Sequence, residues 1–173
     1  MKVEKLSDLK KELKSLNSER LVEICLKLSK YKKENKELLS YLLFDSTNPF
    51  LYAENVKEML KPGFLSLSRP SYTSTKEIRK IIRLITKHAK YTGSKEVETE
   101  LLLWFCEQFL EYADTRTHHK PLLLIFSRQI EKIKRILPKL HEDFQFDFGT
   151  TYTQIIQKAG AEMRFFDKSG FEL

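Results

Sequence analysis

The sequence is poor in the residues that interrupt helices: among 173 positions it has 5 glycines and 5 prolines. A fold of many short strands joined by tight turns would need more of both, since glycine and proline supply most turn conformations. Lysine, glutamate and leucine are plentiful, and all three are strong helix formers. The composition therefore predicts an all-α fold of about six to eight helices, arranged as stacked antiparallel helical hairpins or as an irregular bundle.

Long apolar runs are also missing, and we expect no leader segment. No run approaches the roughly 20 apolar residues that a membrane-spanning helix needs, and the first residues, Met1–Lys5, lack the apolar core of a signal peptide. The two cysteines, Cys25 and Cys106, lie inside apolar helical segments, so we expect both to be buried free thiols. We expect a cytoplasmic protein with no membrane partner.

Motifs of catalysis and metal binding do not occur. The glycines stand singly, which rules out a glycine-rich phosphate loop, and His118–His119 is an adjacent pair without zinc-ligand spacing. Glu96 and Glu100 lie one helical turn apart, as do Glu107 and Glu111, but no Glu-x-x-His motif accompanies them. We therefore expect no enzyme, no cofactor and no metal. A helical enzyme built on Glu96, Glu100 or the histidines stays a third hypothesis.

Apolar spacing and capping residues place the expected helices. They predict helices over about residues 7–16, 18–44, 49–60, 75–90, 94–114, 121–137 and 150–158. Ser7 and Asn48 are expected N-caps, the pair Asn17–Ser18 offers another, and Ser94 is expected to begin the helix after Gly93. The segment 18–44 is either one helix or two with a break near Asn35, and continuity is favoured because no glycine or proline interrupts it.

Between and after these helices we expect less regular structure. Residues 62–73 are the longest expected loop, and the alternation in Asp143–Phe148 predicts an extended segment that packs its phenylalanines on the helices. The expected organisation is one helical domain over 1–160 and a weakly ordered C-terminal tail over 161–173.

Charge is distributed unevenly over the two helices expected on either side of Gly93. Residues 75–90 hold six bases and one acid, whereas residues 94–114 hold six acids and one base. On the basic helix, one face carries a row spaced by four, three, four and three residues: Lys76, Lys80, Arg83, Lys87 and Lys90. A second row on the helix from Pro121 repeats the spacing: Arg128, Lys132, Arg135 and Lys139.

These features support two functional interpretations. Charged helical faces without a reactive group are typical of a non-enzymatic interaction module, whose partner is another protein or a second copy of the chain. With a net charge of +7, the two basic rows would instead allow a nucleic acid to bind, if the rows lie side by side. The acidic helix between them in the sequence weakens the second interpretation, because it could pair with the basic helix.

Two segments, Leu26–Phe44 and Ile78–Phe105, resemble uncharacterised small cytosolic helical proteins of bacteria. The resemblance covers about the first two thirds of the chain and includes no functional motif. It implies an all-helical fold, and it transfers no catalytic or binding residue.

Overall fold

The computed structural model describes residues 3–69 and 71–173. Within these ranges the chain forms eight α-helices and no strand, which confirms the predicted all-α fold. Its contacts divide the chain into two compact units, Met1–Ser46 and Thr47–Leu173, called unit 1 and unit 2 below. Because a domain is a unit that folds by itself, the domain bounds expected from the sequence, 1–160 and a tail over 161–173, stay a prediction.

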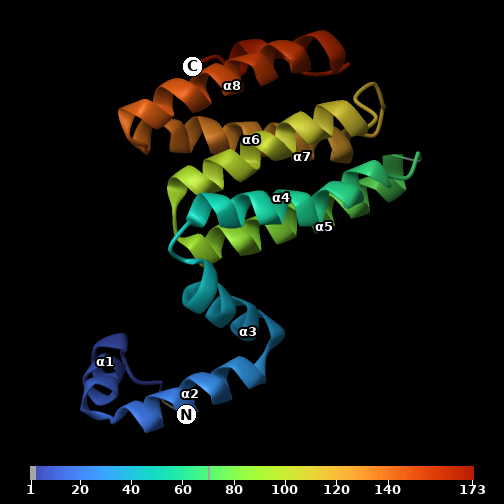
Figure 1. The fold of residues 1–173 in the computed structure, drawn as a ribbon. Helices are drawn as coiled ribbons and strands as arrows, with labels where there is room; N and C mark the ends of the chain where they lie inside the picture. Colours follow the sequence, from blue (N-terminus) through green and yellow to red (C-terminus); the bar gives the residue numbers. More distant parts are fainter. Residues whose placement is uncertain (1–2, 70) are drawn as a thin grey trace. The chain divides into compact units, whose positions relative to one another are not determined.

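Unit 1 consists of short helices (Figure 1). These are α1 (Leu6–Ser15), α2 (Ser18–Tyr31), α3 (Lys33–Ser40) and a π-helical turn over Tyr41–Asp45. Of the expected cap pair Asn17–Ser18, Asn17 caps α2: its Oδ1 accepts a hydrogen bond of 2.9 Å from the backbone N–H of Arg20. Ser7 is not a cap, because α1 begins one residue before it and Lys5 occupies the N-cap position.

The expected continuous helix over 18–44 is wrong. Lys32 is extended, with φ −143° and ψ 148°, and separates α2 from α3. Asn35 explains the break without a glycine or proline: its Nδ2 donates a 2.9 Å hydrogen bond to the carbonyl of Leu28. This bond satisfies one of the carbonyls that the end of α2 leaves without an intrahelical partner.

Unit 2 consists of five longer helices followed by a C-terminal segment. The helices are α4 (Pro49–Leu65), α5 (Ser71–Thr92), α6 (Lys95–Tyr112), α7 (Lys120–Ile136) and α8 (Glu142–Glu162). Short 3-10 turns over Leu137–Lys139 and Lys168–Gly170 follow α7 and α8.

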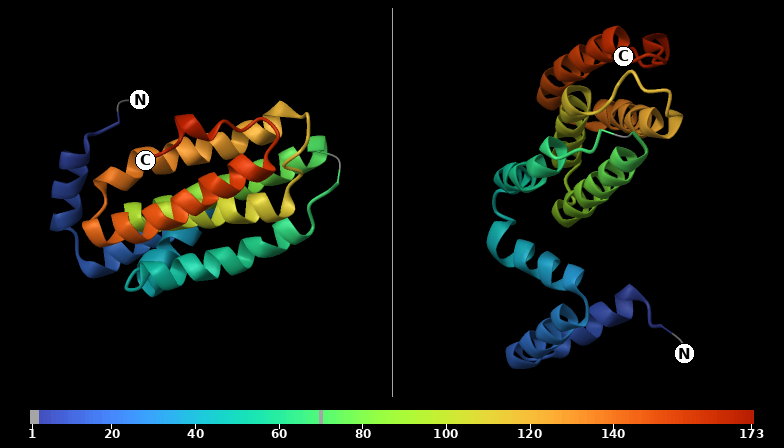
Figure 2. Two further views of the ribbon diagram at one scale, coloured as in Figure 1. Left: turned by 90° about the horizontal axis from the view of Figure 1, so that it is seen from above. Right: turned by 90° about the vertical axis from the view of Figure 1, so that its right-hand side faces the viewer.

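These five helices form two layers. In Figure 1, α4, α6 and α8 run in one direction, and α5 and α7 run in the opposite direction. The right-hand view of Figure 2 shows unit 2 nearly end on, with α4, α6 and α8 in one layer and α5 beside α7 in the other. The contacts agree: α6 packs against α4 and α8 in its own layer and against α5 and α7 in the other, and α5 packs against α7. Successive helices thus form stacked antiparallel hairpins.

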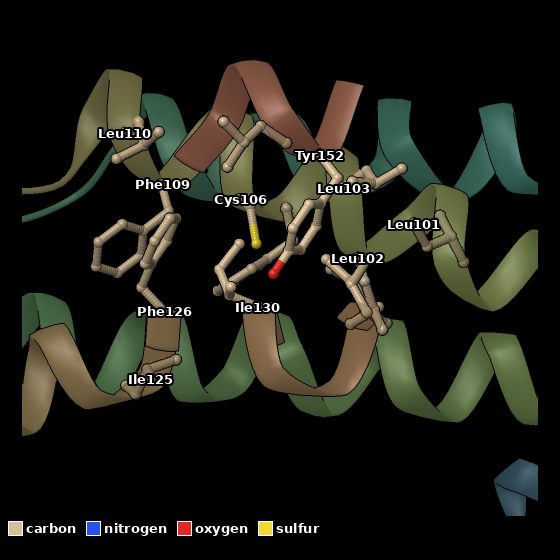
Figure 3. Packing of buried hydrophobic residues seen from close by; sticks show 14 of the residues in the cluster. Leu101, Leu102, Leu103, Cys106, Phe109, Leu110, Ile125, Phe126, Ile130 and Tyr152 are labelled. Carbon is tan, nitrogen blue, oxygen red and sulfur yellow. The ribbon is translucent and has the colours of Figure 1, made fainter. Parts of the chain in front are cut away.

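The core lies between the two layers and is built around α6. Phe105, Cys106 and Phe109 of α6 have no exposed surface. Phe109 and Phe126 of α7 bring their ring centroids within 5.3 Å of each other. Figure 3 shows the sulfur of Cys106 among these rings and Tyr152 of α8. A helix that is apolar around most of its circumference must be covered on most sides. Four helices, α4, α5, α7 and α8, cover α6.

One expected irregular segment is helical in part, and the other is helical throughout. The expected loop over 62–73 begins too early, because α4 continues through Pro62 to Leu65. Phe64 explains this continuation: it is 1% exposed, and its ring lies edge-on to Trp104 at 5.5 Å. Burying a phenylalanine stabilises the last turn by about 1.5–3 kcal/mol, enough to offset most of the cost of a proline inside a helix.

The predicted extended segment Asp143–Phe148 is wrong, because it is the first part of α8. Phe144 and Phe148 are four residues apart and pack on each other at 5.5 Å, and Phe144 stacks on Phe50 of α4 at 5.7 Å. His141 caps the helix by accepting a hydrogen bond of 3.4 Å from the N–H of Asp143. The expected last helix over 150–158 is therefore only the middle of α8.

The C-terminal segment after α8 packs on unit 2. Phe166 lies edge-on to Phe126 at 5.5 Å and stacks on Phe171 at 4.9 Å. The hydroxyl of Tyr152 donates a 2.8 Å hydrogen bond to the carbonyl of Phe171. The Nζ of Lys134 on α7 donates a 2.6 Å hydrogen bond to the carbonyl of Glu172.

Candidate functional site

The predicted basic row of α5 points away from the core. Four of its members, Lys76, Lys80, Arg83 and Lys90, are exposed, and Lys87 is half-buried. The opposite side of α5 is buried between the two layers and carries Ile78, Ile81, Ile85 and Ala89. Arg79 is exposed as well and adds a cation that the sequence-based row omitted, although it lies three residues after Lys76 and four before Arg83.

No acidic side chain of α5 shares this exposed face. Glu77 is the helix's one acid, and it is half-buried. Its carboxylate accepts hydrogen bonds from the backbone N–H of Ser68 at 3.0 Å and from the Ser68 hydroxyl at 2.8 Å. Glu77 therefore caps the segment that follows α4 and does not neutralise the row.

The row on α7 is partly engaged within the fold. Arg128, Arg135 and Lys139 are exposed, but Lys132 is half-buried. The Nζ of Lys132 lies 2.6 Å from Oε1 of Glu98 on α6, so this predicted site residue forms an intramolecular ion pair. Three of the four predicted α7 cations thus remain available at the surface.

The layer arrangement brings the two rows to the same side of unit 2. Their helices lie side by side in the layer of α5 and α7, and both rows lie opposite residues that are buried against the other layer, such as Ile85 and Ile133. The ring centroids of Tyr72 and His119 are 6.2 Å apart, so α5 and α7 also begin at the same end. The sequence could not show this, because it places an acidic helix between the rows.

Glu98, Glu100 and Glu111 of α6 form ion pairs with cations other than those of the α5 row. Glu98 pairs with Lys95 and Lys132, and Glu111 lies 3.5 Å from the Nζ of Lys158 on α8. Glu100 pairs with Lys57 of α4 at 2.6 Å. In the part of the chain that the structure describes, Lys76, Lys80, Arg83 and Lys90 form no ion pair. The expected neutralisation of these four cations by α6 is therefore absent from residues 3–69 and 71–173.

Exposed charge consequently differs between the two layers of unit 2. The exposed cations of α5 and α7 are Lys76, Arg79, Lys80, Arg83, Lys90, Lys120, Arg128 and Arg135, against the one exposed acid Glu131. The exposed acids of α4, α6 and α8 are Glu54, Glu58, Glu107, Glu111, Glu142, Asp143 and Asp147, against the exposed cations Lys61, Lys95 and Lys158. We call the exposed side of α5 and α7 the cationic face.

The acids proposed for a catalytic site are not brought together. Glu96 accepts a 2.6 Å hydrogen bond from the hydroxyl of Ser94, which caps the same helix and lowers the pKa of Glu96. Glu100 instead points to Lys57 of α4. Burial raises the pKa of Glu107, which is countered in part by Lys57 and Lys158. The histidines serve local roles, such as the 2.6 Å hydrogen bond between His88 Nδ1 and the Tyr52 hydroxyl.

Unit 1 presents a different surface, which the sequence did not mark as a site. Of its described residues, Tyr41 is the one buried hydrophobic side chain. The large apolar residues exposed on it are Val3, Leu6, Leu9, Leu13, Val22, Leu26, Leu28, Tyr31, Leu42, Leu43 and Phe44. Cys25 is exposed too, so the predicted burial of this thiol is wrong, whereas Cys106 is buried as predicted. Cys25 lines an open groove of about 340 Å³ with Leu28, Leu38 and Leu42.

The described helices include none that is long and apolar enough to cross a membrane. Residues 3–69 and 71–173 contain no group of three or more histidine, cysteine or acidic side chains placed to hold a metal ion. Comparison of the chain with protein-family models, curated proteins and solved structures finds no match. The resemblance to small helical bacterial proteins therefore stays a prediction.

Proposed function

We propose that the protein is a non-enzymatic helical interaction module with a protein partner, and that unit 1 supplies the docking surface. The observation that supports this is the exposure of leucines that follow helical spacing. Leu6 is 85% exposed, Leu9 45% and Leu13 43%, and all three lie on one side of α1. With Leu16 and Leu21 they line an open groove of about 580 Å³.

Unit 1 has few stabilising contacts of its own, which favours a partner that buries its exposed leucines. Its helices have 10, 14 and 8 residues, and isolated helices of such lengths are marginal in water. One buried side chain, Tyr41, cannot supply the hydrophobic stabilisation that a unit of this size requires. A partner that buries the largely exposed Leu6 would gain about 1.5–3 kcal/mol, and burial of Leu9 and Leu13, which are less exposed, would add about half as much each.

The occupant that fits best is a second copy of unit 1. Leu6, Leu9, Leu13 and Leu16 step by three, four and three residues, the spacing of the a and d positions through which identical helices pair. Both signs of charge accompany the leucines on α1, since Lys10, Lys11 and Lys14 are balanced in part by Asp8 and Glu12. Two copies of α1 can therefore face each other without strong repulsion.

The molar mass in solution tests this proposal. Sedimentation equilibrium over a range of concentrations should show a wild-type dimer and a monomeric Leu9→Lys/Leu13→Lys variant. The matched control is Met59→Lys/Leu124→Lys, which changes two residues of unit 2 that are 52% and 50% exposed. This control should associate like the wild type.

Two results would overturn the proposal. One is a wild-type protein that stays monomeric up to about 1 mM, where an association would be too weak to define a complex. The other is a Leu9→Lys/Leu13→Lys variant that associates as tightly as the wild type while its circular dichroism is unchanged.

A further inference from the structure

The cationic face is long enough to follow a polyanion. From Lys76 to Lys90 the row spans about 21 Å at 1.5 Å per residue. Packed helices have axes about 8–10 Å apart, so Arg128 and Arg135 of α7 form a second line of charge beside the first.

The connection between α6 and α7 extends this face at one end. The hydroxyls of Ser71 and Thr117 lie 2.7 Å apart, and the Ser71 hydroxyl donates a 3.0 Å hydrogen bond to Asp114. These bonds hold the connection beside the start of α5. Arg116 is exposed there and adds one cation near Lys120 of α7, at the end of the face where Lys76 lies, while the exposed carboxylate of Asp114 offsets one of these charges.

The arrangement costs stability in the free protein. Cations three or four residues apart on a helix repel each other. In the row from Lys76 to Lys90 no exposed acid of the same helix offsets this repulsion. Anionic groups bound along the row would relieve it.

We infer that the cationic face binds the phosphate backbone of a nucleic-acid duplex without reading its sequence. Two lines of cations on neighbouring helices match two phosphate backbones across a groove, which is about 6 Å wide for the minor and 12 Å for the major groove of B-DNA. Base readout uses asparagine, glutamine and arginine at base edges. The exposed residues of α5 and α7 include no asparagine or glutamine, and Gln129 of α7 is half-buried with its Nε2 bonded to the carbonyl of Ile125 at 3.2 Å.

The same face is poorly suited to single strands. Proteins that bind single strands stack bases on aromatic side chains beside a basic groove. On α5 the exposed aromatic is Tyr72, and the Nζ of Lys76 lies over its ring, 4.6 Å from the centroid. A base would have to displace this lysine before it could stack there.

Fluorescence anisotropy with a labelled random-sequence DNA duplex of about 20 base pairs tests the inference. If about six cations contact phosphates, the logarithm of the affinity should fall against the logarithm of salt concentration with a slope near −5. The variant Arg83→Glu/Arg135→Glu should bind roughly a hundredfold more weakly at low salt, with a slope smaller in magnitude by about 2. The single strand of the same length should bind more weakly than the duplex.

Two control variants distinguish an effect of the cationic face from an effect of net charge and from an effect of misfolding. Lys27→Glu/Lys61→Glu makes the same change in charge at exposed residues of α2 and α4, outside the cationic face, and should bind like the wild type. Arg83→Lys/Arg135→Lys keeps the charges and should retain affinity within a few-fold, because phosphate neutralisation does not require a guanidinium.

Several results would overturn the inference. They are absence of duplex binding at low salt, equal loss in the Lys27→Glu/Lys61→Glu control, equal binding of polyglutamate, and tighter binding of the single strand. The polyglutamate result would point to an acidic protein as the partner. None of these outcomes bears on self-association through unit 1, because the two sets of variants share no residue.

Discussion

Lys57 of α4 and Glu100 of α6 form an ion pair of 2.6 Å across the interface of two helices in the same layer. Their side chains are 14% and 20% exposed, so water screens the pair only in part. Lys57 also lies 2.6 Å from Oε1 of Glu54, one turn before it on α4. Among the described residues, the second carboxylate oxygen of Glu100 is buried and has no hydrogen-bond partner. Glu100 therefore depends on Lys57 for its compensation.

Replacing Lys57 with methionine should lower the free energy of unfolding by about 1–3 kcal/mol. The reason is that the change leaves a partly buried carboxylate without its counter-charge. Urea denaturation at neutral pH measures the effect. Lys61→Met, at an exposed position on the same helix, is the matched control and should stay within about 0.5 kcal/mol of the wild type. Equal midpoints for Lys57→Met and the wild type would contradict the argument.

Glu100 and Glu98 should affect the pH dependence of stability in opposite directions. Burial raises the pKa of Glu100 above its usual 4.5, and Lys57 offsets this only in part. Burial acts upward on Glu98 too, but the hydrogen bonds from Lys132 and Lys95 outweigh it and lower the pKa below 4.5. The contribution of Glu100 to the free energy of unfolding is thus present below the usual pKa of glutamate and is lost as the pH rises through the raised pKa. The contribution of Glu98 is present above the usual pKa of glutamate and is lost as the pH falls through the lowered pKa of Glu98.

Two glutamine variants measure these signs. As the pH rises, Glu100→Gln should gain stability relative to the wild type, because the variant has no carboxylate to ionise. Glu98→Gln should lose stability relative to the wild type over the acidic range as the pH rises. Unfolding free energies over pH values of about 3–8 give both differences. Differences of the same sign for the two variants would rule out one of the assignments.

Replacing Gly93 with alanine should destabilise the protein by about 1–2 kcal/mol. Gly93 joins α5 to α6 with φ +64°, the left-handed conformation that side chains with a Cβ atom disfavour. An added Cβ would meet nothing within 4 Å, so the cost would come from the backbone alone. Gly170→Ala is the control, because its Cβ would also meet nothing and its φ lies outside this region. Thermal or urea unfolding should show a shift for Gly93→Ala and almost none for Gly170→Ala.

The two cysteines should react with a thiol reagent at very different rates. Cys25 is exposed and should react at once in the native protein. Cys106 has no exposed surface, and burial raises the pKa of its thiol, so it should react only after unfolding. Counting modified thiols by mass spectrometry before and after adding denaturant checks this. Cys25→Ser, in which no thiol should react in the native state, identifies the fast group.

Short-range signals predicted the starts of α4 and α6. Asn48 accepts a 3.1 Å hydrogen bond from the N–H of Leu51 with Pro49 in the first turn, and Ser94 accepts one of 3.1 Å from the N–H of Val97. These caps need only neighbours along the chain, which the sequence displays directly. Phe144 and Phe148 are ambiguous in the sequence, because their spacing satisfies both an alternating strand and one face of a helix. The contact of Phe144 with Phe50, far away in the sequence, favours the helix.

Part of the candidate site was predictable because the spacing of residues along one helix is visible in the sequence. Helical spacing alone identified the row from Lys76 to Lys90 and its outward direction. Its neighbour on α7 depends on the order of helices within a layer, which spacing does not encode. Glu98 likewise removes Lys132 from the surface through a contact between α6 and α7.

The central position of α6 has a consequence for cooperativity. In an extended array of helical repeats each element contacts only its neighbours along the chain, and the array can unfold piecewise from its ends. In unit 2, α6 packs against α4, α5, α7 and α8, so no route to the unfolded state can expose α6 while the other four helices stay fully packed. The amide protons of Leu101 to Phe109 should accordingly exchange with solvent only through global unfolding, and unit 2 should lose its structure in a single transition.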